Sequence, residues 1–215
     1  FNSDRDDLVM NLYRKRANGT GEVERLTTSE SNQWANSWSP DGSILAFGEF
    51  AGASAGEIMF YRPGADPEVE VFLATPYWEW AAEFSPDGRF VAYSSAESGT
   101  SEVYVRSADG KGAQVKVSTS TAREPRWAGP TELIYRSEDE ILSARLSVQG
   151  DVLKPALPES LLDLPLTQWS LRFRVSPDGQ RIMATRSLEE ASSRRDPVVV
   201  INWHDELEAK VPAAK

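Results

Sequence analysis

Cysteine is absent from this chain of 215 residues, and histidine occurs once. Without cysteine, the chain has no disulfide bonds, no thiol catalysis and no cysteine-based zinc site. The lack of thiols is compatible with an oxidising compartment. The single histidine, His204, lies beside the acidic pair Asp205-Glu206. We expect it to be a solvated side chain rather than the base of a catalytic triad.

Long apolar runs are also absent. No run approaches the roughly 20 residues that cross a bilayer, so we expect no direct membrane insertion by this segment. The chain starts at Phe1, without Met, a basic n-region or an apolar h-region, and it shows no targeting signal. We interpret this start as that of a fragment or a processed product.

Basic residues are too few for a nucleic-acid-binding protein. The chain has 23 Lys and Arg against 33 Asp and Glu, a net charge of −10. Nucleic acids and anionic membrane surfaces attract clustered basic residues, and the basic residues here are scattered. We therefore expect neither partner, and we interpret the acidity as a feature that favours solubility.

Sequence motifs of several enzyme classes are missing. The chain contains no Gly-rich phosphate loop, no HRD and no DFG motif of a kinase, and no GxSxG elbow of a hydrolase. Two acidic stretches, SDRDD at 3–7 and RSEDE at 136–140, could suit a hard cation. The first lacks the Gly and the distal Glu of a calcium-binding EF-hand loop. We predict solvated loops at both places, no metal site and no cofactor.

A repeated tetrapeptide is the strongest signal in the sequence. It follows an apolar anchor residue and precedes an apolar run, and its three copies are Ser39-Pro40-Asp41-Gly42, Ser85-Pro86-Asp87-Gly88 and Ser176-Pro177-Asp178-Gly179. A degenerate copy, RWAGPTELIY, lies at 126–135. The four anchor residues are spaced by 46, 43 and 48 residues, and they are Trp38, Phe84, Trp127 and Val175.

The composition of the tetrapeptide predicts a turn rather than a catalytic site. Ser and Asp bond to backbone N–H groups, Pro presets φ, and Gly supplies the positive φ that leads into the next strand. Such a turn joins two antiparallel strands in register. We predict a structural role for all three copies.

Each repeat contains four short runs rich in Val, Tyr, Phe and Thr. Four strands in about 45 residues are typical of a β-propeller blade. We predict an all-β propeller of four-stranded antiparallel blades, with almost no helix except around HDELEAK (204–210). We expect the chain to be an open arc of four to five blades from a larger propeller. The domain covers 1–205, with a partial blade at 1–28, units at 29–75, 76–119, 120–163 and 164–205, and a tail at 206–215.

The repeats SWSPDGSILAF, EFSPDGRFVAYSSAESGTSEVYVRS and RVSPDGQRIMAT resemble the WD40-like, PD40-type repeats of TolB-like propellers. The chain is most similar to the propeller that follows the kinase domain and membrane span of many bacterial serine/threonine kinases, as in the end VVVINWHDELEAKVP. The resemblance covers essentially the whole chain. It implies an extracytoplasmic C-terminal region, with any kinase domain upstream of Phe1.

Aromatic residues gather in the loops that would surround the channel mouth of the propeller. Exposed aromatic side chains beside polar groups are typical of peptide or protein recognition. The candidate binding residues are Tyr77, Trp78, Glu79, Arg123, Glu124, Gln168 and Trp169. The alternative for Trp78 and Trp169 is burial between blades. Burial is favoured for Trp34 and Trp80, and also for the anchors Trp38 and Trp127.

These observations favour a non-catalytic propeller that binds a protein or peptide, for instance a cell-envelope component. The alternative is an accessory propeller of a hydrolase, either a peptidase or a glycan-active enzyme. A glycan-active site would require paired carboxylates in the channel, for which Glu79, Glu83 and Glu124 are the candidates. A third alternative is a scaffold without a ligand.

Overall fold

The computed structural model describes residues 1–6, 8–50, 55–149, 152–163 and 173–184. Within these ranges the chain forms antiparallel sheets and no helix, which confirms the predicted all-β fold. No described segment is a helix that could cross a membrane. The predicted helix at 204–210, His204 and the tail at 206–215 lie outside the described residues, as does most of the unit expected at 164–205.

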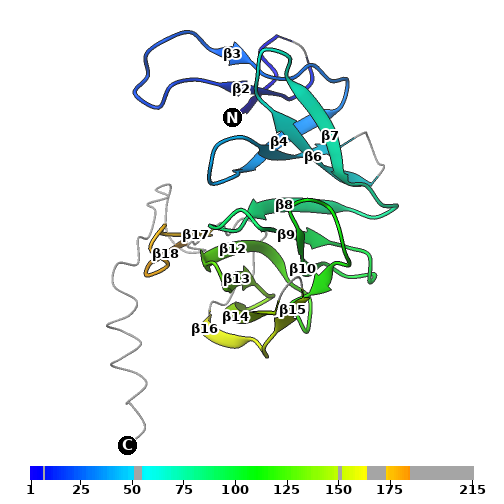
Figure 1. Cartoon of the computed structure of the whole chain (residues 1–215), viewed down its shortest axis with the longest axis vertical. Helices are drawn as coiled ribbons and strands as arrows, with labels where there is room; N and C mark the ends of the chain where they lie inside the picture. The colour runs from blue at the N-terminus through cyan, green and yellow to red at the C-terminus, as the bar shows by residue number, and fades with distance from the viewer. Residues whose placement is uncertain (7, 51–54, 150–151, 164–172, 185–215) are drawn as a thin grey trace, which may run out of the picture.

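The described strands form sheets that follow one another along the chain (Figure 1). The first sheet contains β1 (Asn2–Ser3), β2 (Asn11–Arg14) and β3 (Glu24–Arg25). The second contains β4 (Asn32–Trp38), β5 (Leu45–Phe50), β6 (Gly56–Arg62) and β7 (Glu68–Leu73). The third contains β8 (Glu79–Phe84), β9 (Phe90–Ser95), β10 (Glu102–Ser107) and β11 (Val115–Lys116).

The fourth sheet contains one more strand than we predicted. Its strands are β12 (Arg123–Gly129), β13 (Glu132–Arg136), β14 (Glu140–Gln149), β15 (Val152–Pro155) and β16 (Glu159–Asp163). The long strand β14 pairs with β16 along its first half and with β15 along its second half. The β14–β15 hairpin is therefore an extension of the blade. The fifth sheet contains β17 (Phe173–Val175) and β18 (Ile182–Ala184).

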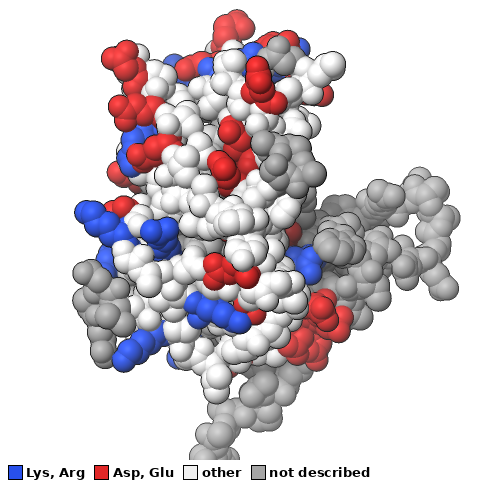
Figure 2. All heavy atoms as spheres, turned by 90° about the vertical axis from the view of Figure 1, so that its right-hand side faces the viewer, with Lys and Arg blue, Asp and Glu red and all other residues white. Residues whose placement is uncertain are grey.

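The sheets lie side by side, with the first strands of successive sheets in contact. Strand β4 contacts β8, β8 contacts β12, and β12 contacts β17. These inner strands form the inner face of an arc, and the last strands of the sheets lie outside. This is the arrangement of propeller blades around an axis. On the side seen in Figure 2, Asp and Glu side chains predominate over the upper part of the molecule, which the first two sheets form.

Strand β9 shows how alternation in the sequence builds the stack. Phe90 and Ala92 pack towards the fourth sheet in one apolar cluster. Val91 and Tyr93 point the other way and join a cluster with the second sheet. Both faces of the strand are apolar, so the sheet must be covered on both sides, as neighbouring blades do. Similar clusters join the first sheet to the second and the fourth to the fifth.

The repeated tetrapeptide forms the turn between the first two strands of a sheet. In the first copy, the Ser39 hydroxyl donates to Asp41 Oδ1 at 2.6 Å and accepts from Ile44 N at 2.9 Å. The glycine N–H donates to the Ser39 carbonyl, and Gly42 has a φ of 72°. The copies at 85–88 and 176–179 repeat these bonds. The polar groups of the turn thus bond to one another.

The anchor residues do not all pack as predicted. Phe84 and Trp127 are 5% and 6% exposed and lie in the cores between sheets. Trp38 is 42% exposed, so its predicted burial is wrong. An anchor packs against the preceding sheet, and the sheet that precedes Trp38 offers three short strands among the described residues. Less apolar surface is therefore available to cover the Trp38 ring.

Candidate functional site

The inner strands of the second, third and fourth sheets are each interrupted by a β-bulge. The pairing register shifts between Ala35 and Ser37 in β4, after Trp80 in β8 and after Arg123 in β12. In β8 and β12 the bulge holds Ala81 and Glu124 at the unusual φ of 56°. Such a conformation costs a non-glycine residue about 1–3 kcal/mol and is concentrated at functional sites.

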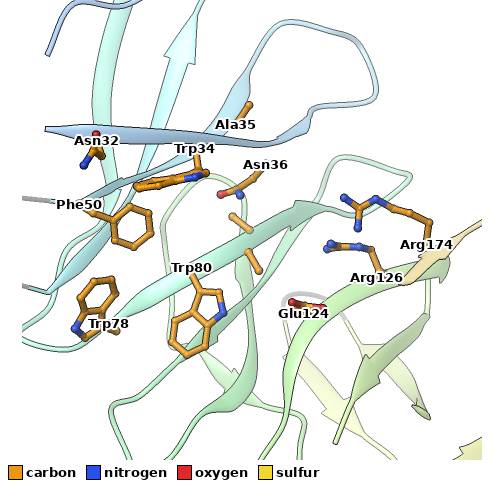
Figure 3. A pocket seen from close by; sticks show the side chains of 12 residues that line it. Asn32, Trp34, Ala35, Asn36, Phe50, Trp78, Trp80, Glu124, Arg126 and Arg174 are labelled. Atoms are coloured by element: carbon orange, nitrogen blue, oxygen red, sulfur yellow. The ribbon is translucent and has the colours of Figure 1, made fainter. Parts of the chain in front are cut away.

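A pocket of about 540 Å³ lies on the inner face of the arc, where these bulges meet (Figure 3). This volume falls within the usual range of small-ligand and peptide pockets. The lining comes from five strands and the loop before β8, and it consists of Asn32, Trp34, Ala35, Asn36, Phe50, Trp78, Trp80, Ala81, Ala82, Glu124, Arg126 and Arg174. Both strained residues, Ala81 and Glu124, belong to it.

Three aromatic rings, with Phe50 in contact with the other two, form one wall of the pocket. The Phe50 ring packs edge-on against Trp34, with centroids 5.0 Å apart and an interplanar angle of 76°. On its other side it stacks on Trp78, at 5.2 Å and 25°. We call Trp34, Phe50 and Trp78 the aromatic wall. Trp80 lies beside it in Figure 3, and Trp34 and Trp78 remain 40% and 42% exposed.

Two glycines leave the space in which the Phe50 ring lies. A Cβ atom on Gly56 would approach Phe50 Cε1 to 2.5 Å, and one on Gly48 would approach Cε2 to 2.8 Å. Real Cβ atoms do not come so close, so only glycine permits the ring to lie across β5 and β6. The position of the aromatic wall therefore depends on these two positions of the second sheet.

Two arginines lie at the opposite end of the pocket (Figure 3). Arg126 Nη1 lies 2.9 Å from Glu83 Oε2, and Arg174 Nη1 donates to the Phe173 carbonyl at 2.9 Å. Burial raises the pKa of Glu83, and the charges of Arg126 and Arg174 oppose that rise. Within the described part of the chain, the buried Arg126 Nε group has no hydrogen-bond partner. We call Arg126 and Arg174 the guanidinium end.

The three predicted residues of the 75–80 loop lie in different environments, two exposed and one buried. Tyr77 and Trp78 are 46% and 42% exposed, and Trp78 lines the pocket. Glu79 was predicted as a contact residue, but its side chain is fully buried. Its Oε1 accepts from Thr75 Oγ1 at 2.5 Å and from Ser95 Oγ at 3.2 Å. Burial raises the pKa of Glu79, and its carboxyl group is not available to a partner.

The other predicted residues are divided between the pocket and its surroundings. Glu124 lines the pocket, and Arg123 precedes it in β12 outside the lining. Gln168 and Trp169 lie outside the described residues. The predicted burial of Trp34 is wrong, and Trp80 is half-buried; both line the pocket.

Sequence reasoning missed Phe50, Arg126 and Arg174. A signal for the two arginines existed, because Arg126 and Arg174 each directly precede an anchor residue, Trp127 and Val175. The same repeat position must point to the same place in neighbouring blades. Phe50 carried no such signal, because it ends a second strand and reaches the pocket only across two glycines.

The inner-strand carboxylates considered for hydrolysis have separate partners. Glu79 bonds to Thr75 and Ser95, whereas Glu83 bonds to Arg126 and to the backbone N–H of Trp127. At the acidic stretch 3–7, Asp6 accepts a hydrogen bond from the Tyr13 hydroxyl at 2.8 Å. Among the described residues, no group of three His, Asp or Glu is arranged to hold a metal ion.

Neither a protein-family model nor a curated protein matches this chain. Among solved structures, TolB from Acinetobacter baumannii is similar, with a TM-score of 0.63 and 17% identity over 85% of this chain and 44% of that one. The periplasmic gluconolactonase of Pseudomonas aeruginosa gives a TM-score of 0.52 and 15% identity over 82% of this chain and 56% of that one. The chain thus spans about half the length of these relatives. Its fold is an arc of a TolB-like β-propeller.

Proposed function

We propose that this chain is a non-catalytic binding module that receives a segment of a partner protein, or a peptide, in the inner-face pocket. The observation that carries the proposal is the aromatic wall. Trp34 and Trp78 remain about two-fifths exposed although Trp34 packs edge-on against Phe50 and Trp78 stacks on it. Aromatic side chains that are ordered by packing and still accessible are typical anchors of recognition sites.

The strained backbone of the pocket supports the same proposal. Ala81 and Glu124 hold left-handed conformations at equivalent bulges of neighbouring inner strands. A fold that needed these strands only for packing would be more stable without this strain. The bulges turn the adjacent side chains towards the pocket, and this is what bulges do near binding sites.

The proposal is tested by selecting binders from a random-peptide display library against the purified chain. Enriched peptides are then titrated against Trp34→Ala, Trp78→Ala and a matched control, Trp38→Ala. Trp38 is 42% exposed, like Trp78, but lies outside the pocket lining. We expect each wall variant to weaken binding by about 1–3 kcal/mol, and Trp38→Ala to leave it unchanged. If the enriched peptides bind both wall variants as tightly as wild type, the proposal is contradicted.

A second candidate function is that of an accessory or lactone-hydrolysing propeller. The fold similarity to a periplasmic gluconolactonase favours this class, and Glu124 is the carboxylate in the pocket lining. This candidate predicts hydrolysis of a sugar lactone by the wild-type chain and its loss in Glu124→Gln. If the wild-type chain hydrolyses the lactone no faster than buffer alone, this candidate function is wrong.

The sequence resemblance extends the first proposal to the cellular context. The propellers it points to follow a kinase domain and a membrane span, so we propose an extracytoplasmic location and a cell-envelope partner. The coding sequence upstream of Phe1 tests this directly, since it must encode a kinase domain followed by one apolar span of about 20 residues. An upstream region without either would refute the kinase context and leave the pocket proposal unaffected.

A further inference from the structure

We infer that the ligand of the inner-face pocket is a peptide segment that carries an aromatic side chain and a carboxylate. This inference rests on the proposed binding function and specifies its chemistry. The aromatic wall would hold the aromatic side chain, and the guanidinium end would hold the carboxylate, which either an acidic side chain or a free C-terminus could supply.

The aromatic wall defines the first requirement. Trp34 and Trp78 flank the same Phe50 ring, one edge-on and one stacked. The remaining exposed ring faces can stack with a further flat group, and aromatic pairs prefer such offset or edge-on contacts. Phe50 itself is fixed against Gly48 and Gly56, so the wall is preorganised and little conformational freedom is lost on binding.

The charges at the other end define the second requirement. Arg126 and Arg174 line this end of the pocket, and Arg126 pairs with the partly buried Glu83, which lies outside the lining. Among the described residues, the lining itself contains two arginines and one carboxylate, that of Glu124. Its side chains are therefore more cationic than anionic, in a chain whose net charge is −10. Arginine binds carboxylates through paired N–H donors, and it does so most strongly in partly buried sites.

The separation of the two ends favours a peptide over a small anion. The aromatic wall belongs to the second sheet and the loop before β8, whereas the guanidinium end belongs to the fourth and fifth sheets (Figure 3). A ligand that reaches both must cross the bulged strands β8 and β12. Asn36 lies between the two ends in Figure 3 and offers a polar group to an extended backbone. Cationic ligands would also stack on aromatic rings, but the two arginines repel them.

The experiment uses blocked peptides of the form N-acetyl-Trp-(Ser)n-Glu-amide, with n from 0 to 4, titrated by calorimetry against the whole chain. Three companion panels replace Glu by Gln, replace Trp by Leu, or replace the Glu-amide end by Ser with a free C-terminal carboxylate. The protein variants are Arg174→Gln, Arg174→Lys and the control Arg181→Gln. Arg174 is exposed and Arg181 is an exposed arginine of the same hairpin, paired with Asp178 outside the pocket.

We expect at least one member of the Glu or free-carboxylate panel to bind wild type about 10-fold more tightly than its Gln counterpart. That preference should fall below about 3-fold in Arg174→Gln, return in part in Arg174→Lys, and persist in Arg181→Gln. It should also weaken with added salt. Which of the two panels binds identifies the source of the carboxylate. Replacing Trp by Leu should weaken binding at least as much as Trp78→Ala does.

Other outcomes separate this inference from the proposed function. If the Gln or Leu peptides bind as tightly as the Glu peptides, the carboxylate or the aromatic requirement is wrong, and the binding function stands. The inference is overturned if display yields peptides that need Trp34 and Trp78 but contain no acidic group. It is also overturned if a neutral sugar occupies the pocket and the peptides do not. If no peptide in either experiment distinguishes wild type from the wall variants, the binding function itself fails.

Discussion

At the scale of single residues, three glycines share one backbone conformation but differ in their surroundings. Gly42, Gly88 and Gly179 all have a φ of 72°. A Cβ atom on Gly42 would meet nothing within 4 Å, and one on Gly88 would lie 3.4 Å from the Pro40 ring of the neighbouring turn. On Gly179 it would lie 2.1 Å from the carbonyl oxygen of Ala128, a backbone atom. The backbone strain that a non-glycine residue would have is the same at all three positions, whereas the steric cost of its Cβ atom differs.

Substitution of each glycine by alanine should therefore destabilise the fold to a graded extent. We expect Gly42→Ala to lower the free energy of unfolding by about 1 kcal/mol, the cost of a left-handed conformation for an L residue. Gly88→Ala should cost slightly more, and Gly179→Ala the most, because the backbone of β12 must move. Urea denaturation of the three variants measures the order. Equal losses at all three positions would show that contacts between successive turns contribute nothing.

Glu79 gives a second prediction, which concerns pH. Oε2 of its buried carboxyl group has no hydrogen-bond partner among the described residues, and burial raises the pKa of this group above the ordinary value. A carboxyl group with a raised pKa in the folded state binds protons more readily when folded. Its contribution to stability is complete below the unfolded pKa, near 4.5, and is lost as the pH rises through the folded value.

Replacement of Glu79 by a side chain that cannot ionise should make the chain more stable at neutral pH. Glu79→Gln keeps an oxygen that accepts from Thr75 and Ser95 and has no charge to bury. We expect its thermal midpoint at pH 7 to equal or exceed that of wild type, and the advantage to shrink as the pH falls towards 4.5. The control is Glu68→Gln on the exposed surface of β7, where no charge is buried, and its thermal midpoint should equal that of wild type at both pH values. A midpoint of Glu79→Gln well below wild type at pH 7 would contradict this account.

At the scale of strands, the pattern of the sequence predicted the repeat but not the deviations from it. The tetrapeptide turns and the period of the anchors were enough to predict the sheets, because turn chemistry and alternation are local properties. The bulges were not predictable, since Ala81 and Glu124 are not residues that favour positive φ. The exposure of Trp34 follows from its bulged strand and could not be read from its spacing. The buried state of Glu79 depends on Thr75 and Ser95, which come from neighbouring segments.

The glycines beneath Phe50 provide a prediction at this scale. Gly56→Ala places a methyl group at 2.5 Å from the Phe50 ring and 2.9 Å from the Glu79 carbonyl, so the ring must move. We expect a loss of about 1–3 kcal/mol, as for other overpacked sites, and a change in the near-UV circular dichroism of the stacked aromatic rings. Gly64→Ala is the control, because its Cβ would have only ordinary contacts, at 3.9 Å or more. An unchanged aromatic signal in Gly56→Ala would mean that the glycines do not position the wall.

At the scale of the whole molecule, successive sheets are joined by a recurring hydrogen bond between inner strands. In the second and third sheets, the side chain of the residue before the anchor accepts from the backbone N–H of the next anchor. Ser37 Oγ accepts from Phe84 N at 3.2 Å, and Glu83 Oε1 accepts from Trp127 N at 3.1 Å. Trp127 Nε1 also donates to the Glu83 carbonyl at 3.1 Å. The sheets are thus joined by polar contacts as well as by apolar clusters.

The contact at Glu83 can be tested by two substitutions. Glu83→Ala removes the acceptor of the Trp127 N–H and the ion-pair partner of the largely buried Arg126. We expect a loss of about 2–4 kcal/mol in the free energy of unfolding. Glu83→Gln keeps an acceptor oxygen, and burial already disfavours the charged carboxylate, so its loss should be less than half as large. Denaturation curves at pH 7 compare the two. Equal losses would mean that the charge, and not the hydrogen bond to Trp127, joins these sheets.

Arg126 occupies the position that in the two preceding sheets accepts the inter-sheet hydrogen bond, and a guanidinium group has only donors. Among the described residues, the sheet of β17 and β18 is joined to its neighbour by the apolar cluster around Phe173 and by the Arg126 guanidinium group over the Phe173 ring. We expect the amides of this short hairpin to exchange with solvent through local openings that leave the rest folded. Because Arg174 is part of that sheet, each opening removes half of the guanidinium end. A ligand that needs both arginines must then hold the last sheet closed, so binding should slow hydrogen exchange at Phe173–Val175 far from the aromatic wall. Affinity in this molecule would be set partly by the order of one short hairpin, and any change that stabilises the hairpin should tighten binding without adding a contact.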